Sequence, residues 1–122
     1  MSDSERAIAS VERTLEASAA LREHLLEMEL TGRRMISAIE RGVPITEAVE
    51  AAGSSAAEVR SSTKELLDNY ESARHEMRAA FILPSVEGGM TIGELGRTLG
   101  VSRQLASRLV QEARETLATA DS

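Results

Sequence analysis

The chain has 122 residues, of which 42% are hydrophobic but only 2% aromatic, and its formal net charge is −6. It contains no cysteine, which excludes a disulfide framework and a zinc site built on thiolates. No apolar run is long enough to span a bilayer, and the polar, acidic start is unlike a secretory signal. We therefore expect a cytoplasmic protein without membrane contact, and the bias toward arginine, with Lys64 as the only lysine, suits a bacterium with a GC-rich genome. The chain's many Ala, Leu, Glu and Arg residues favour helices, so we expect an all-α fold.

The N-terminal third predicts a long helix over residues 4–41, continuous or interrupted, with Ser2 or Ser4 as its N-cap. Gly42 and Pro44 are expected to end it. Large apolar residues recur along this helix at heptad-like spacing: Leu21, Leu25, Met28, Met35 and Ile39. A stripe of this length exceeds what the rest of the chain can cover, so it indicates a homodimer. The alternative is an ordinary core within one chain.

Two further helices are predicted in the middle of the chain. Residues 44–53 predict a short helix between helix breakers, and residues 56–83 predict a long one. Ser55 and Glu58 have the spacing of a capping box at the start of the long helix. Pro84 is expected to end it, and a loop is expected to follow.

The segment Thr91–Gln111 predicts two shorter helices joined by a turn. Thr91 and Glu94 form a capping box, in which the hydroxyl accepts a backbone amide and the carboxylate reaches back. Gly96 lacks a side chain at the place where the second helix would approach closely. Gly100 suits the left-handed conformation that ends helices.

The second of these helices has one apolar and one polar side. Ala106, Leu109 and Val110 fall on the inward side. The polar residues of the segment are candidates for binding DNA, because their side chains can bond phosphates and base edges. Ser102 is also the expected N-cap, and two candidates, Arg97 and Gln111, are expected to contact phosphates. The full set comprises Arg97, Ser102, Arg103, Gln104, Ser107, Arg108 and Gln111.

This segment resembles the helix-turn-helix family of bacterial and phage regulators. The matching residues are Gly96, Gly100 four residues later, Val101 directly after it, and Leu109 in the second helix. The sequence GVSRQLAS is also similar to the recognition helix of region 4 in bacterial sigma factors. The resemblance covers about a sixth of the chain and implies a second helix that enters the major groove of double-stranded DNA.

Two residues depart from the family pattern. Ala106 stands where a β-branched residue is usual, and Leu105 stands where the side chain is often polar and faces DNA. Three positions are open for Leu105: against the first helix, against a thymine methyl group, or against a partner. The alternative interpretation of the whole segment is an ordinary helical hairpin with a charged face.

These patterns divide the chain into a helical dimerisation scaffold (residues 1–83), a loop (residues 84–90) and a helix-turn-helix region (residues 91–122). The predicted function is sequence-specific DNA binding by a homodimeric bacterial transcriptional regulator. One alternative is a helical adaptor that binds another protein, either antitoxin-like or associated with a sigma factor. The other is a nucleoid-associated protein with little sequence preference.

The acidic residues lie mainly outside the candidate DNA-binding segment. Residues 1–90 carry 16 acidic and 10 basic side chains, which account for a charge of −6. Residues 92–111 carry one acidic side chain against three arginines, which makes this segment positive. An acidic body weakens indiscriminate binding to DNA, so a monomer should have little non-specific affinity.

No group of residues indicates an enzyme, and we expect neither a cofactor nor a metal. The serines lack both a nearby histidine base and a nucleophile-elbow signature. His24 and His75 have Glu27 and Glu71 at helical spacing, which predicts surface pairs rather than a full set of metal ligands.

A faint internal repeat relates residues 45–59 to residues 92–106, with an offset of 47 residues. Ile45, Glu47, Gly53 and Ser55 match Ile92, Glu94, Gly100 and Ser102. The first copy has Ala56 and Ala57 in place of Arg103 and Gln104, so we expect no DNA contact there. Either it is a degenerate second helix-turn-helix or the match is due to chance.

Overall fold

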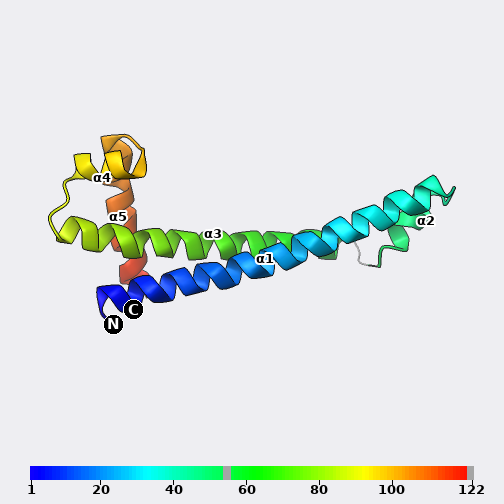
Figure 1. Cartoon of the computed structure of the whole chain (residues 1–122), viewed down its shortest axis with the longest axis horizontal. Coiled ribbons are helices and arrows are strands. Elements are labelled where there is room, and N and C mark those ends of the chain that lie inside the picture. The colour runs from blue at the N-terminus through cyan, green and yellow to red at the C-terminus, as the bar shows by residue number, and fades with distance from the viewer. Residues whose placement is uncertain (54–55, 121–122) are drawn as a thin grey trace. The chain divides into compact units, whose positions relative to one another are not determined.

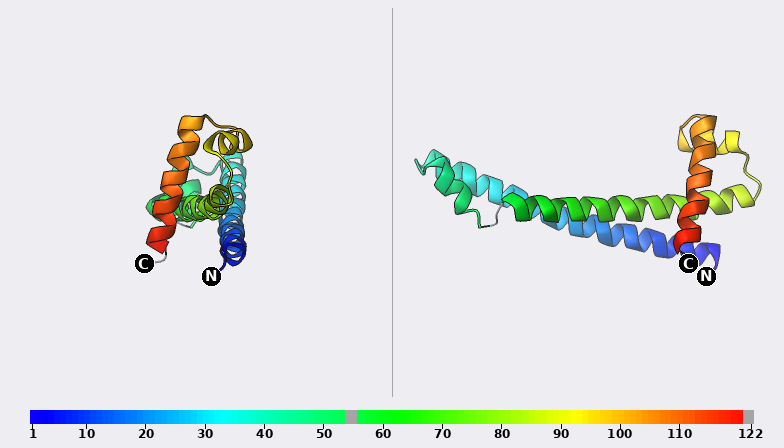
Figure 2. Two further views of the ribbon diagram at one scale, coloured as in Figure 1. Left: turned by 90° about the vertical axis from the view of Figure 1, so that its left-hand side faces the viewer. Right: turned by 180° about the vertical axis from the view of Figure 1, so that it is seen from behind.

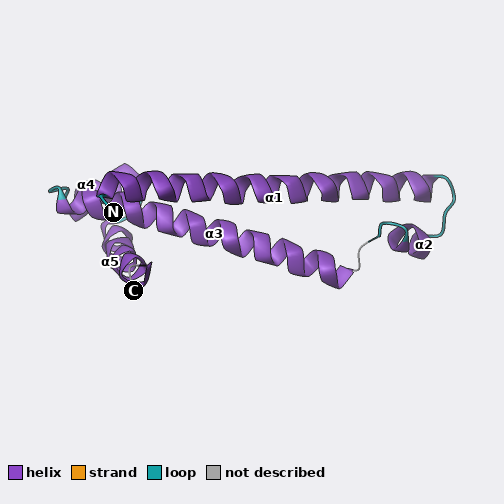
Figure 3. Ribbon diagram, turned by 90° about the horizontal axis from the view of Figure 1, so that it is seen from below, coloured by secondary structure: helices purple, strands orange, loops and turns teal. Residues whose placement is uncertain are grey.

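A computed structural model of the chain describes residues 1–53 and 56–120, and this part of the chain is helical with short connections and no strand (Figures 1 and 3). The predicted all-α fold with long N-terminal helices is confirmed. None of the described helices combines the length and the apolar character needed to cross a membrane. The elements are α1 (Asp3–Glu40), α2 (Ile45–Glu50), α3 (Ala56–Glu87), α4 (Ile92–Leu99) and α5 (Arg103–Ala120).

Helix α1 is one continuous helix, which decides between the continuous and the interrupted helix that the sequence left open. The Ser2 hydroxyl accepts a hydrogen bond from the Glu5 amide at 3.1 Å, which makes Ser2 the N-cap. At the other end Gly42 adopts a left-handed φ of 91°, and the Val43 amide reaches back to the Ala38 carbonyl at 3.0 Å. These bonds satisfy carbonyls that the end of a helix leaves unpaired, and they confirm the predicted end of the helix.

Helix α3 continues through Pro84 and ends at Glu87, so the prediction that Pro84 ends the helix and begins a loop is wrong. Proline removes only its own amide bond, and the following turn is kept because the Gly88 amide donates to the Pro84 carbonyl at 2.8 Å. Apolar residues also continue at helical spacing on both sides of Pro84, from Ile82 to Val86, and both contribute to the hydrophobic core. Burial of this stripe offsets the cost of proline in the last turn of the helix.

The chain forms two compact units, and the first combines residues 1–15 with residues 71–122. Its core joins α3, α4 and α5, and the views in Figures 1 and 2 agree that α5 lies across the C-terminal half of α3. The start of α1 is held to α3 by a hydrogen bond from Thr14 Oγ1 to the Ala73 carbonyl (3.3 Å) and by an ion pair of Arg13 with Glu76. The buried members of the core are Ala79, Ile82, Leu83, Leu95, Ala106, Leu109, Val110 and Ala113.

The second unit, residues 16–70, holds the rest of α1, α2 and the first half of α3. Within its described residues, only Ala17 and Ala48 have buried side chains. The His24 Nε2 atom lies 2.7 Å from Thr63 Oγ1 and so links α1 to α3, which corrects the predicted pairing of His24 with Glu27. This unit therefore has helix-to-helix contacts but almost no core of its own.

Replacing Leu95 with Ala should lower the free energy of unfolding by about 2–5 kcal/mol, because the Leu95 side chain is 3% exposed and its loss leaves a cavity. Ile45→Ala is the control, since Ile45 is 68% exposed and its truncation should cost about 0.5 kcal/mol or less. Urea unfolding followed by circular dichroism measures both. Equal losses for the two variants would contradict the assigned core.

Candidate nucleic-acid interface

The N-terminus of α4 is capped by Thr91, as predicted. The Thr91 hydroxyl accepts the Glu94 amide at 3.1 Å and donates to the Glu94 carboxylate at 3.0 Å. The predicted capping box had the carboxylate reaching to a backbone amide, whereas here it holds the hydroxyl of the capping residue. The corresponding prediction for Ser55 and Glu58 lies partly outside the described residues, because Ser55 is not among them.

The turn between α4 and α5 depends on Gly100, which has φ 70° and ψ 33°. This left-handed conformation is the one predicted, and it allows the Val101 amide to bond the Gly96 carbonyl at 2.8 Å. Helix α5 then begins under the cap of Ser102, whose hydroxyl accepts the Leu105 amide at 3.1 Å. The turn is thus short, with each end fixed by a hydrogen bond.

Helix α5 lies against α4 at Gly96, where even a Cβ atom would be crowded. A Cβ atom at this position would lie 3.0 Å from the Val101 carbonyl oxygen and 3.6 Å from the Ala106 Cβ atom. The predicted close approach is therefore present. It also accounts for Ala106 in place of the β-branched residue usual in the helix-turn-helix family, because the Ala106 side chain is fully buried against this contact.

Helix α5 separates apolar from polar side chains as predicted. Ala106, Leu109 and Val110 are buried, and Leu105 is half-buried against the same core. Of the three positions open for Leu105, the structure therefore supports packing within the chain. The opposite side of the first turns is exposed and carries Arg103, Gln104, Ser107, Arg108 and Gln111.

The two arginines of this exposed side are available for a ligand. Within the described part of the chain, neither Arg103 nor Arg108 forms an ion pair or a hydrogen bond through its side chain. The first acidic residue of α5 is Glu112, whose carboxylate lies 4.0 Å from the Arg78 guanidinium. The positive part of the helix therefore ends at Gln111, whose side-chain amide is 3.4 Å from the Glu115 carboxylate.

The two remaining candidates lie at the edge of this surface. Arg97 is exposed on α4 rather than α5. Ser102 is exposed, but its hydroxyl already accepts the Leu105 amide. Its established role is therefore to cap the helix that carries the other candidates.

A contact between α3 and α5 was not predicted from the sequence. His75 is 3.0 Å from Arg78 through Nδ1 and 3.0 Å from the Thr116 hydroxyl through Nε2. The predicted pair of His75 with Glu71 is wrong, because the Glu71 carboxylate accepts from Arg74 at 3.2 Å instead. No group of three or more histidines and carboxylates in the described residues is placed to hold a metal ion.

The internal repeat extends to local structure. Helix α2 begins at Ile45 and α4 at Ile92, so these two helices keep the offset of 47 residues. A left-handed glycine follows the first helix in each copy, at Gly53 and Gly100. The first copy has no glycine at the place of Gly96, and the residue there, Val49, is half-exposed. The two segments thus share a left-handed glycine, but the first lacks the close contact at Gly96 and the arginines.

Comparisons of this chain with protein-family models, with curated proteins and with solved structures found no match.

Gly100→Val should destabilise the α4–α5 turn by about 1–3 kcal/mol, because a β-branched residue resists positive φ. A Cβ atom at Gly100 has no heavy atom within 4 Å, so the effect would come from backbone strain rather than a clash. Gly100→Asn is the matched control, since asparagine tolerates this conformation. Thermal unfolding compares the two variants, and equal stability would show that the left-handed conformation is not needed.

Proposed function

We propose that this protein is a sequence-specific DNA-binding protein, in the manner of a transcriptional regulator, and that the first turns of α5 enter the major groove. One observation carries the proposal. Five polar side chains, none of them acidic, line the exposed side of residues 103–111, while the opposite side of the same helix is anchored in the core. A helix presented in this way fits the width of the major groove.

The chemistry of the exposed side chains suits base edges and phosphates. Arginine pairs with two acceptors of guanine, and glutamine pairs with adenine through its amide, so Arg103, Gln104 and Arg108 are the proposed base readers. Ser107 can bond either kind of base. Arg97 and Gln111, at the edges of the surface, are proposed to bind phosphates and so fix the position of the helix on the duplex.

The proposal includes a homodimer formed through residues 16–70. Five large apolar side chains of α1 in this unit are between 41% and 58% exposed: Leu25, Leu26, Leu30, Ile36 and Ile39. Complete burial of each of these side chains would stabilise the protein by on the order of 1 kcal/mol. The described residues of this unit include only two buried side chains, both alanines. Contact with a second copy would bury the exposed apolar side chains and complete a core.

Charged residues between these apolar side chains suit a second copy of the same helix. Arg22, Glu29 and Arg33 are exposed and spaced by seven and four residues, so they follow one side of α1. Their signs alternate along the helix, which allows a glutamate of one copy to meet an arginine of the other. A two-fold dimer would present two α5 helices to successive major grooves, roughly 34 Å apart.

The alternatives predict different binding behaviour, which one experiment compares. Selection from a random DNA library, followed by a salt titration on the selected and on mixed sequences, should yield a defined site for the proposed regulator. A nucleoid-associated protein would bind all sequences equally. An adaptor that binds only protein would retain no DNA, and its exposed apolar side chains on α1 would then serve another protein.

Arg103→Ala and Arg108→Ala should each weaken binding to the selected site by about 1–3 kcal/mol, because each removes a base contact. Both side chains are exposed, so helix content should be unchanged. Arg114→Ala is the matched control: this arginine is exposed on the same helix but beyond Gln111. Fluorescence anisotropy on labelled DNA measures the affinities. Two variants that bind as tightly as the unchanged protein would refute the assignment of α5.

Leu25→Glu should produce a monomer, because Leu25 is 47% exposed within one chain but would be buried between two. A charge buried there without a partner costs several kcal/mol. Met28 lies in the same stripe but is half-buried within its own chain, so its replacement would disturb the chain itself. Sedimentation at micromolar concentration is the measurement, with Ser62→Glu on the exposed surface of α3 as the control. An unchanged protein that already sediments as a monomer would contradict the dimer.

A further inference from the structure

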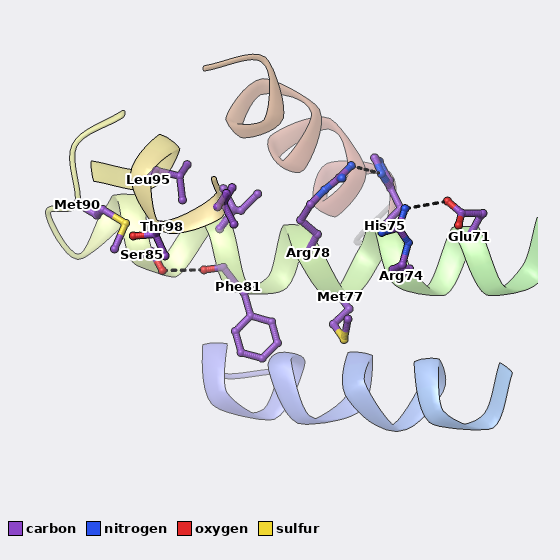
Figure 4. A pocket seen from close by; sticks show the side chains of 12 residues that line it. Glu71, Arg74, His75, Met77, Arg78, Phe81, Ser85, Met90, Leu95 and Thr98 are labelled. Atoms are coloured by element: carbon purple, nitrogen blue, oxygen red, sulfur yellow. Dashed lines mark hydrogen bonds and ion pairs between the residues drawn. The ribbon is translucent and has the colours of Figure 1, made fainter. Parts of the chain in front are cut away.

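A cavity of about 510 Å³ lies between α3 and α4, within the unit that carries the candidate DNA-binding surface (Figure 4). This volume is in the range of pockets that bind small molecules. The residues that line it come from residues 71–85 of α3, from Met90 and from the second half of α4. The cavity is therefore built from α3, α4 and the segment between them.

One end of the cavity is apolar. Met90, Leu95 and Leu99 line it, and Leu99 is 39% exposed although it lies at the C-terminus of an otherwise well-packed helix. The two hydroxyls nearby add little polarity, because Ser85 donates to the Phe81 carbonyl at 2.9 Å and Thr98 to the Glu94 carbonyl at 3.0 Å. This end suits a hydrocarbon or aromatic body.

The other end is cationic. Arg74 and Arg78 line it together with His75 and a single carboxylate, that of Glu71. Each guanidinium uses only part of its donors: Arg74 meets Glu71 through one nitrogen at 3.2 Å, and Arg78 meets the His75 ring at 3.0 Å. Arg78 also faces Glu112 of α5, but at 4.0 Å. The two arginines therefore keep donors free for an anion, and a planar fork of this kind matches a carboxylate.

We propose that this cavity binds a small amphipathic carboxylate, such as a medium-chain fatty acid. The apolar body would lie against Leu95 and Leu99, and the carboxylate would lie between Arg74 and Arg78. An anion is favoured over a neutral apolar ligand because both arginines keep donors that neither Glu71 nor Glu112 uses, and Glu112 reaches Arg78 only at 4.0 Å. No residue that lines the cavity belongs to α5, so binding of this ligand does not depend on DNA binding.

Decanoate is the probe, and decanol is its uncharged match. Titration of the full chain labelled with nitrogen-15 should show saturable binding of one decanoate per chain, with amide shifts near Arg74, Arg78 and Leu99. Decanol should bind at least about tenfold more weakly, because it lacks the charge-assisted hydrogen bonds. Shifts confined to the exposed apolar residues of α1 would place the ligand elsewhere and would overturn the proposal.

Two variants test the cationic end. Arg74→Gln should weaken decanoate binding several-fold without unfolding the chain, since the Arg74 side chain is 51% exposed and pairs only with exposed Glu71. Adding Arg78→Gln should bring the affinity for decanoate down to that for decanol. Arg60→Gln, at an exposed arginine in the first half of α3, is the control and should bind decanoate normally. No saturable binding at millimolar decanoate, or equal binding of acid and alcohol by all variants, would refute the site.

Discussion

The contact between α4 and α5 at Gly96 is the constraint on which the C-terminal part of the molecule depends. A Cβ atom at this position would lie only 3.0 Å from the Val101 carbonyl oxygen in the turn and 3.6 Å from the Ala106 Cβ atom of α5, so the two helices approach closely. This contact decides which side of α5 is buried with Ala106 and which side is left exposed. The polar side chains are held in place because the helix that carries them cannot rotate without breaking it.

The two compact units differ in how far they bury their apolar side chains. The unit that contains α4 and α5 recruits Ala79, Ile82 and Leu83 of α3 and buries a continuous core. Among the described residues of 16–70 the buried side chains are small, and several large apolar side chains stay exposed. A small helical unit of this kind gains stability chiefly by burying these side chains against other surfaces. Local packing and the proposed assembly thus belong to separate parts of one chain.

Signals that act over a few residues made most of the fold predictable. The cap at Thr91, a cap at Ser2 or Ser4, the helix end at Gly42 and the left-handed Gly100 could be inferred because their chemistry is local. The prediction that Pro84 ends the helix is wrong because the apolar stripe continues to Val86, and burial of this stripe outweighs the backbone cost of proline. That stripe is visible in the sequence and could have corrected the prediction.

Contacts between residues that are distant in sequence could not be predicted. The contacts of His24 with Thr63 and of His75 with Thr116 join different helices, and helical spacing only suggests neighbours on the same helix. The cavity beside Leu99 could not be predicted either, because it exists only once two helices have packed together. The discontinuous first unit also has a consequence for biosynthesis. Its N-terminal segment leaves the ribosome roughly 5–20 s before Leu117 completes its core, at ordinary rates of translation. During that interval Arg13 and Thr14, which contact α3, lie beside an unfinished core, so a segment of the unit that is made early is among the last to reach its final surroundings.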